Sequence, residues 1–164
     1  MNSSIEAAGL LGILEKQLRL FRELSGDLVA CRTAYVAMNL DAIYQHIGTQ
    51  SAICDQLRDI DRERKIAWCA TCAASGVDPD AADLRELTTR IDTGIGEAMR
   101  DVVTKLALAE GELRNLNRAH TVLIDGSRRT LAVLGNVLAS FSPTYARPAN
   151  SASIAVSAIH GVPR

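Results

Sequence analysis

Apolar residues recur at alternating gaps of three and four for almost sixty residues of this chain, from Leu84 to Phe141, and no proline interrupts them. This spacing is the heptad pattern of a long α-helix. At 1.5 Å per residue, such a helix would extend over roughly 85 Å. A rod of this length presents a long surface to other proteins and offers little of what an enzyme pocket requires.

Two earlier segments carry a similar pattern. The first, from Ser4 to about Met38, has a stripe wide enough to contact two neighbouring helices, as in a bundle. The phase of the pattern then changes, at a point where Asn39 or Asp41 can cap a new helix. A kink in one long helix would produce the same shift. We favour two separate helices.

The clearest boundary in the chain follows the second segment. Gly76 can end a helix in a left-handed conformation, and Asp78 or Asp80 can cap the next one, with Pro79 in its first turn. The pattern predicts a third helix from about Ala81 to Phe141. Glycines at positions 94 and 96 mark the expected bend within it.

The composition agrees with helix packing. Nearly half of the 164 residues are apolar, whereas aromatic residues make up only 4%, a balance typical of helix–helix seams. The sequence after Phe141 contains three prolines, many small residues and no helical period. We therefore predict an all-α fold: an elongated antiparallel bundle or coiled coil of three long helices over residues 1–141, with a flexible tail over residues 142–164.

Charge and cysteine content narrow the possible functions. The net charge is −1, and acidic and basic residues are interspersed. The sequence therefore shows no basic patch that would bind nucleic acid or anionic lipid. The apolar run near the N-terminus is broken by Glu6, Glu15 and Lys16, which argues against a signal peptide or a stable membrane insertion. Four cysteines at this density fit reduced thiols, and we expect a cytoplasmic protein.

One segment resembles a catalytic motif: Trp68-Cys69-Ala70-Thr71-Cys72. Redox sites of this form need a preceding strand and a βαβ unit, and neither is predicted here. The motif falls near the C-terminal end of a helix, where the dipole disfavours a thiolate. We therefore interpret the two cysteines as small residues packed in an alanine-rich last turn of the helix. A thiol redox protein is the weakest of three functional hypotheses for this chain.

No other arrangement predicts an enzyme. The cysteines and histidines lie at no recognised zinc spacing, and there is no glycine loop for phosphate and no Ser/His/Asp arrangement. His120, at a seam position beside Asn115 and Asn117, is interpreted as a polar interruption that fixes helix register. The mixed charges of residues 58–65 are interpreted as a solvated face with i,i+4 pairs. We expect no catalysis, no metal and no cofactor.

The end of the third helix is apolar on more than one side. Either the first two helices bury all of this surface, or part of it receives an amphipathic helix from another protein. The apolar residues concerned are Val122, Leu123, Ile124, Leu131, Val133, Leu134, Val137, Leu138 and Phe141.

Several segments of the chain resemble the FlgN family of flagellar export chaperones. The resemblance covers about residues 10 to 148 and rests on residues 40–43 and 52–64, on the pattern Asn117-x-x-His120-x-x-Leu123-Ile124, on residues 130–134, and on Pro143-Thr144-Tyr145. Three positions depart from the family: His120 replaces a second Asn, Ala146 replaces a Gly, and Ser51 replaces a Lys.

The resemblance implies a non-enzymatic cytoplasmic chaperone for hook-associated proteins of the hook–filament junction. Such a chaperone binds the amphipathic C-terminal helix of its client and delivers it to the export gate. Tyr145 would take part in gate docking, and the chain would be a monomer or a weak dimer. The alternative is a coiled-coil structural or oligomerisation protein whose surplus apolar stripe pairs with a second copy. The client-binding residues are predicted to be Leu123, Leu131, Leu134, Val137, Leu138 and Phe141.

Overall fold

The computed structural model describes residues 2–141 of the chain, and the side chains of residues 3–137. These residues form four α-helices and no strand: α1 (Asn2–Val36), α2 (Leu40–Ser75), α3 (Leu84–Arg90) and α4 (Thr93–Phe141). The predicted all-α fold is confirmed for this part of the chain. Two units are distinguished, residues 1–124 and 125–164, and α4 crosses from one into the other. The predicted tail, residues 142–164, lies outside the described residues.

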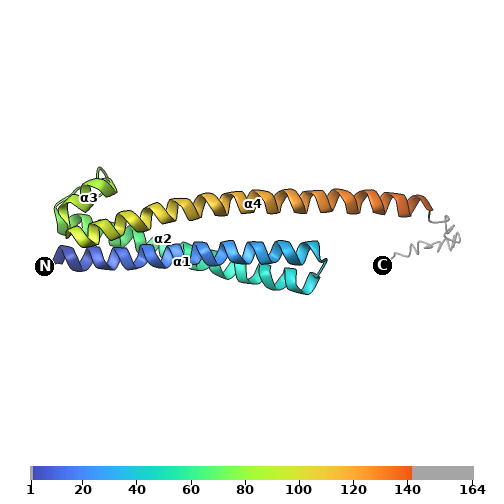
Figure 1. Ribbon diagram of the computed structural model, residues 1–164, viewed down its shortest axis with the longest axis horizontal. Helices are drawn as coiled ribbons and strands as arrows, with labels where there is room; N and C mark the ends of the chain where they lie inside the picture. The colour runs from blue at the N-terminus through green and yellow to red at the C-terminus, as the bar shows by residue number, and fades with distance from the viewer. Residues whose placement is uncertain (1, 142–164) are drawn as a thin grey trace, which may run out of the picture. The chain divides into compact units, whose positions relative to one another are not determined.

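The first two helices form an antiparallel hairpin (Figure 1). Met38 turns the chain with a positive φ of 54°, and Asn39 caps α2 by accepting a hydrogen bond from the backbone N–H of Ala42 at 3.1 Å. The side-chain oxygen of Asn39 thereby satisfies one of the free N–H groups at the start of the helix. The prediction of two separate helices rather than one kinked helix is confirmed.

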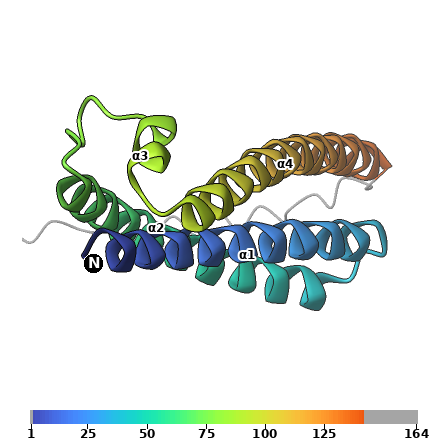
Figure 2. The same cartoon turned by 60° about the vertical axis from the view of Figure 1, so that its left-hand side comes forward.

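Helices α1 and α2 and the first part of α4 pack together in the first unit (Figures 1 and 2). One apolar cluster joins Ala7, Leu10 and Leu14 of α1 to Met99 and Val102 of α4. A second cluster joins Leu20, Leu24 and Leu28 to Ile53 and Ile60 of α2. The wide stripe on α1 is needed because it packs against both neighbours. Since the starts of α1 and α4 meet, these two helices run in the same direction.

The prediction of an unbroken third helix from Ala81 is wrong. The chain leaves the helix at Ile91, which is extended (φ −105°, ψ 172°) and buried. Asp92 then accepts hydrogen bonds from the backbone N–H groups of Gly94 and Ile95. The break therefore precedes the predicted bend. Gly96 instead allows a close approach, because a Cβ there would lie 2.9 Å from the carbonyl oxygen of Thr88 in α3.

The helix boundaries around α3 also differ from the expectation. Gly76 ends α2 with φ 67°, as predicted, and its N–H and that of Val77 return to carbonyls of the last turn. Asp83, rather than Asp78 or Asp80, caps α3 by accepting from the N–H of Glu86 at 2.7 Å. Pro79 lies in the connection before the helix.

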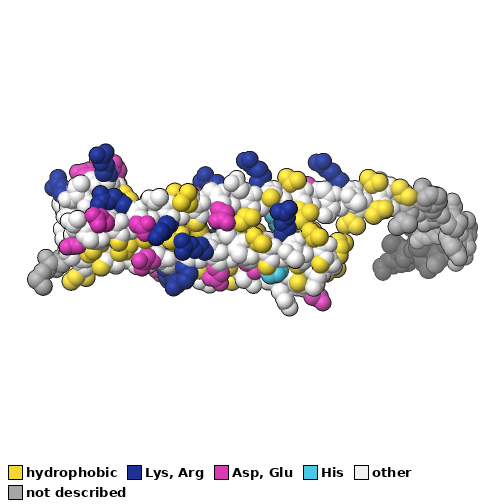
Figure 3. All heavy atoms as spheres, in the orientation of Figure 1, with side chains coloured by type: hydrophobic (Ala, Val, Ile, Leu, Met, Phe, Trp, Pro, Cys, Tyr) yellow, Lys and Arg dark blue, Asp and Glu magenta, His cyan; other side chains and the backbone are white. Residues whose placement is uncertain are grey.

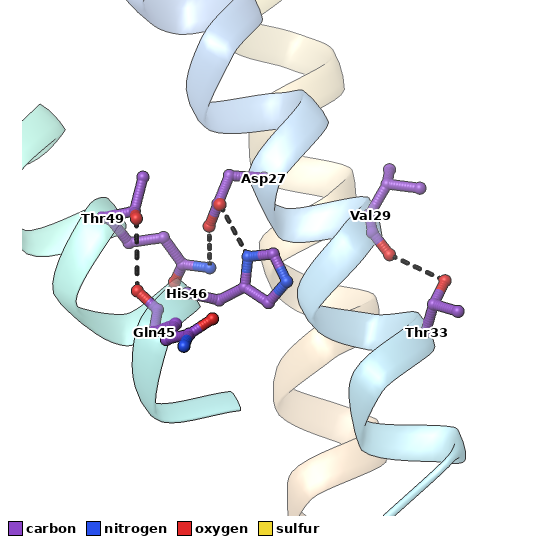
Figure 4. A network of polar contacts seen from close by, with 7 residues as sticks. Asp27, Val29, Thr33, Gln45, His46 and Thr49 are labelled. Carbon is purple, nitrogen blue, oxygen red and sulfur yellow. Dashed lines mark hydrogen bonds and ion pairs between the residues drawn. The ribbon is translucent and has the colours of Figure 1, made fainter. Parts of the chain in front are cut away.

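A polar network joins α1 and α2 near their turn (Figure 4). Asp27 Oδ1 lies 2.7 Å from His46 Nδ1, and Gln50 Nε2 donates to Asp27 Oδ2 at 2.8 Å. His46 and Gln50 share the face of α2 that meets α1, because they are one helical turn apart. Leu40 and Ile47 of α2 are exposed. At this level the interface is polar, and Ile47 points away from it.

The left-handed residue at the end of α2 predicts opposite effects for one substitution at two sites. Gly76→Ala should lower the free energy of unfolding by about 1–2 kcal/mol, because a Cβ disfavours this backbone region. Gly48→Ala, at an exposed site within α2 with open space around it, should raise it by about 0.5–1 kcal/mol. Urea unfolding followed by circular dichroism measures both values. Equal effects of the two substitutions would contradict the assignment.

Candidate functional site

The burial of the seam changes along α4. In the first unit Val102 and Ala109 are each 7% exposed, and Leu113 and Leu116 pack against the cluster of α1 and α2 side chains. In the second unit Leu134 and Val137, which continue the seam, are 51% and 44% exposed. The same heptad positions thus form the core in one part of the helix and open surface in the other.

The predicted client-binding residues fall into three groups. Leu131, Leu134 and Val137 are exposed, with fractions of 58%, 51% and 44%; we call these three residues the apolar stripe. Leu123 is half-buried and belongs to the first unit. The backbones of Leu138 and Phe141 are helical, but their side chains lie outside the described part, as does Tyr145 altogether.

The apolar stripe lies on one face of an amphipathic segment. Positions 131, 134 and 137 follow each other at gaps of three, which keeps them on one side of a helix. Asp125, Arg128 and Arg129, all exposed, fall on the opposite side by the same periodicity. Hydrophobic side chains are open on the C-terminal part of α4 in the space-filling view (Figure 3). Within residues 125–141 there is no second helix against which the stripe could pack.

His120 lies where the seam of the first unit ends. Its ring packs edge-on against Tyr35 of α1, with a centroid distance of 5.7 Å and an interplanar angle of 83°. Its Nδ1 atom is shielded from solvent and has no hydrogen-bond partner. Asn115 and Asn117 are exposed. Of the three residues in the predicted polar interruption, only His120 is therefore in the interface.

The Trp68–Cys72 motif occupies the last turns of α2. Cys72 is fully buried in the core, and burial raises the pKa of its thiol, with smaller contributions from Cys69, Asp78 and Glu86. Cys69 is exposed. The indole Nε1 of Trp68 donates to the carbonyl of Pro79 at 3.2 Å, which ties the α2–α3 connection to the helix. A thiol of raised pKa inside a core is a packing group rather than a nucleophile.

The charges of residues 58–65 pair within α2, except that Glu63 pairs with Lys16 of α1. Arg62 Nη2 lies 2.7 Å from Asp59 Oδ1, and Asp61 holds Arg64 Nη2 and Lys65 Nζ, each at 2.7 Å. These two cations lower the pKa of Asp61 to about 2, mainly through hydrogen bonds. Because the pairs are exposed and local, they contribute little to stability. This agrees with the interpretation of a solvated face.

Neither a metal site nor a membrane-spanning helix is found in the described part of the chain. No group of three or more His, Cys, Asp or Glu side chains within residues 3–137 is placed to hold a metal ion. No helix within residues 2–141 combines the length and the hydropathy that crossing a membrane requires.

Sequence reasoning missed two features of the first unit. The Asp27–His46–Gln50 network left only a weak signal, two polar residues one turn apart on the inner face of α2. The cavity beside Trp68 left no signal in the sequence, because residues from α1, α2, α3, α4 and the α2–α3 connection all line it.

Comparison with known proteins gave no relative: no family model, no curated protein and no solved structure matches the chain.

The burial of the cysteines predicts an order of thiol reactivity. In the native protein at pH 8, Cys69 should react fastest with a disulfide reagent, because it is exposed. Cys31 and Cys72 should react only after unfolding, since both are buried and burial raises their pKa values, leaving less thiolate at a given pH. Mass spectrometry of quenched samples assigns each site. Labelling of Cys72 as fast as that of Cys69 would contradict the account.

Proposed function

We propose that this chain is a FlgN-type flagellar export chaperone that binds the C-terminal amphipathic helix of a hook-associated protein in the cytoplasm. The observation that supports the proposal is the apolar stripe, which is exposed and lies within described residues 125–141, where α4 is the one helix. A solvent-exposed row of leucines is a liability for an isolated protein, and binding a helix would cover it. The family resemblance supports the identity of the client.

The proposed mode of binding is helix against helix. The apolar stripe would receive the client at gaps of three to four residues, the spacing by which two helices interdigitate. Leu138 and Phe141 would extend it by two further positions. The packing of the long helices as a coiled coil is part of this proposal. The mechanism is reversible shielding of apolar surface and involves no catalysis.

The second candidate is a coiled-coil protein in which the apolar stripe pairs with another copy of the chain. The same exposed leucines favour it, because a stripe that fits a client helix also fits itself. Light scattering at dilute concentration separates the candidates. A stable dimer that dissociates when Leu131 and Leu134 are replaced by aspartate would establish the second candidate.

The apolar stripe predicts the effect of two charged substitutions. Leu131→Asp combined with Leu134→Asp should weaken binding of a client C-terminal helix peptide by about a hundredfold or more, because burial of each leucine contributes about 1.5–3 kcal/mol. Calorimetry measures the affinity. Ala132→Asp is the matched control: Ala132 is exposed and lies on the opposite side of the helix from Leu134 by helical periodicity. Unchanged affinity of the double variant, or equal losses in both proteins, would exclude the stripe as the client site.

The family resemblance predicts a separate role for Tyr145. Tyr145→Ala should leave client affinity unchanged and weaken binding of the chaperone–client complex to the isolated export gate, because an aromatic anchor is lost. Tyr145→Phe serves as the control, since it keeps the ring. If the alanine variant and the natural protein bind the gate equally well, this residue has no part in docking.

A further inference from the structure

The first unit contains a cavity of about 390 Å³ beside Trp68. Its apolar lining combines Leu10 and Leu14 of α1 with Trp68 of α2, Leu84 of α3 and Val103 of α4. Its volume lies within the range of small-molecule sites, which are mostly apolar with a few placed polar groups. None of these residues belongs to the apolar stripe, so a ligand in this cavity would be independent of the proposed function.

A second cavity of about 360 Å³ shares Leu14, Arg64 and Val103 with the first. Gln17 and Glu110 contribute to its lining and make it more polar. Arg64 thus lies where an apolar chamber gives way to a polar one. A ligand with an apolar body and a polar end therefore matches the two cavities, with its body in the first cavity and its polar end near Arg64.

The charge of the polar end is set by Arg64 and its neighbours. A single carboxylate, Asp61, serves two cations, Arg64 and Lys65, so one positive charge is left without a counterion in this group. The Nε atom of Arg64 is shielded from solvent and has no hydrogen-bond partner. Asp80 also lines the first cavity, and it disfavours a second negative charge beside the α2–α3 connection. Glu110, which lines the second cavity, pairs with Arg114, so the surplus positive charge of the Asp61 group lies on the Arg64 side.

We propose that the paired cavities bind an amphiphilic carboxylate, with its alkyl chain against Leu10, Trp68 and Leu84 and its carboxylate paired with the guanidinium of Arg64. The chain removes apolar surface from water, and the carboxylate supplies a charge-assisted hydrogen bond to the guanidinium.

Trp68 is the only tryptophan of the chain and reports on the cavity directly. Decanoate, kept below its micelle concentration, should change its emission in a saturable manner with the full-length protein. Decanol, with the same chain and no charge, should bind about tenfold more weakly, the usual contribution of a hydrogen bond to a charged group. Equal binding of acid and alcohol, or no saturable change with decanoate, would overturn the proposal.

Arg64→Gln should weaken decanoate binding about tenfold and leave decanol binding unchanged. Arg58→Gln is the matched control, because Arg58 is an exposed residue of α2 that pairs with Asp55 and lines neither cavity. An Arg64→Gln variant that binds decanoate as well as the control does would overturn the proposal.

Alkylation of the natural protein tests the proposal even if the Arg64→Gln variant does not fold. Cys69 is exposed and lines the first cavity, so decanoate should slow its alkylation by iodoacetamide and decanol should do so only at higher concentration. Alkylation of Cys69 at an unchanged rate in saturating decanoate would also overturn the proposal.

Discussion

The length of α4 constrains everything that this chain can do with its apolar seam. Helix α4 has 49 residues, whereas α1 has 35 and α2 has 36. A helix can bury a continuous seam only along the length of its partners, so more than a dozen residues of α4, or about 20 Å, are in excess of either partner. The burial values follow this limit: seam positions at 102 and 109 are in the core, and those at 134 and 137 are open. This excess is the physical basis of the proposed function.

The two-sided packing of α1 makes the first unit possible. Leu10 and Leu14 belong to a cluster with Cys72 of α2 and Met99 of α4, and Leu24 and Leu28 belong to a cluster with Ile53 of α2 and Leu113 of α4. A helix with a narrower stripe would support only one partner. Near the turn the apolar interface gives way to the Asp27–His46–Gln50 network. Hydrogen bonds of this kind have stricter geometry than apolar contacts, so they favour one register of the hairpin.

Local signals in the sequence predicted much of this architecture. The phase change at Asn39 and the left-handed position at Gly76 gave the two ends of α2, because caps are encoded by single residues. The break before α4 was missed since Leu87, Ile91 and Ile95 continue the heptad across it. All three contribute to one core cluster, so the hydrophobic period does not report the interruption. The local signals of this break are Asp83 and Asp92, because each of them caps the helix that follows it.

The candidate sites differ in how far the sequence could reveal them. The apolar pattern alone predicts that the last helix has more apolar positions than one packed face needs, and Leu131 and Leu134 are among them. Whether these two side chains are exposed depends on which other helices of the chain cover them. The unpaired Nε of Arg64 could not be predicted, because the solvated charges around it at positions 58–65 give the same pattern whether or not a cavity lies beside them. Sites built by several elements need the tertiary arrangement; a stripe on one helix does not.

Amide hydrogen exchange of α4 in dilute, client-free protein tests the central claim most directly. Exposed helix segments open readily, so residues 125–137 should exchange orders of magnitude faster than residues 99–116, and a client helix peptide should slow the exchange of residues 125–137 alone. Equally slow exchange in both segments of the free monomer would contradict the account, because it would mean that the chain already covers its own apolar stripe.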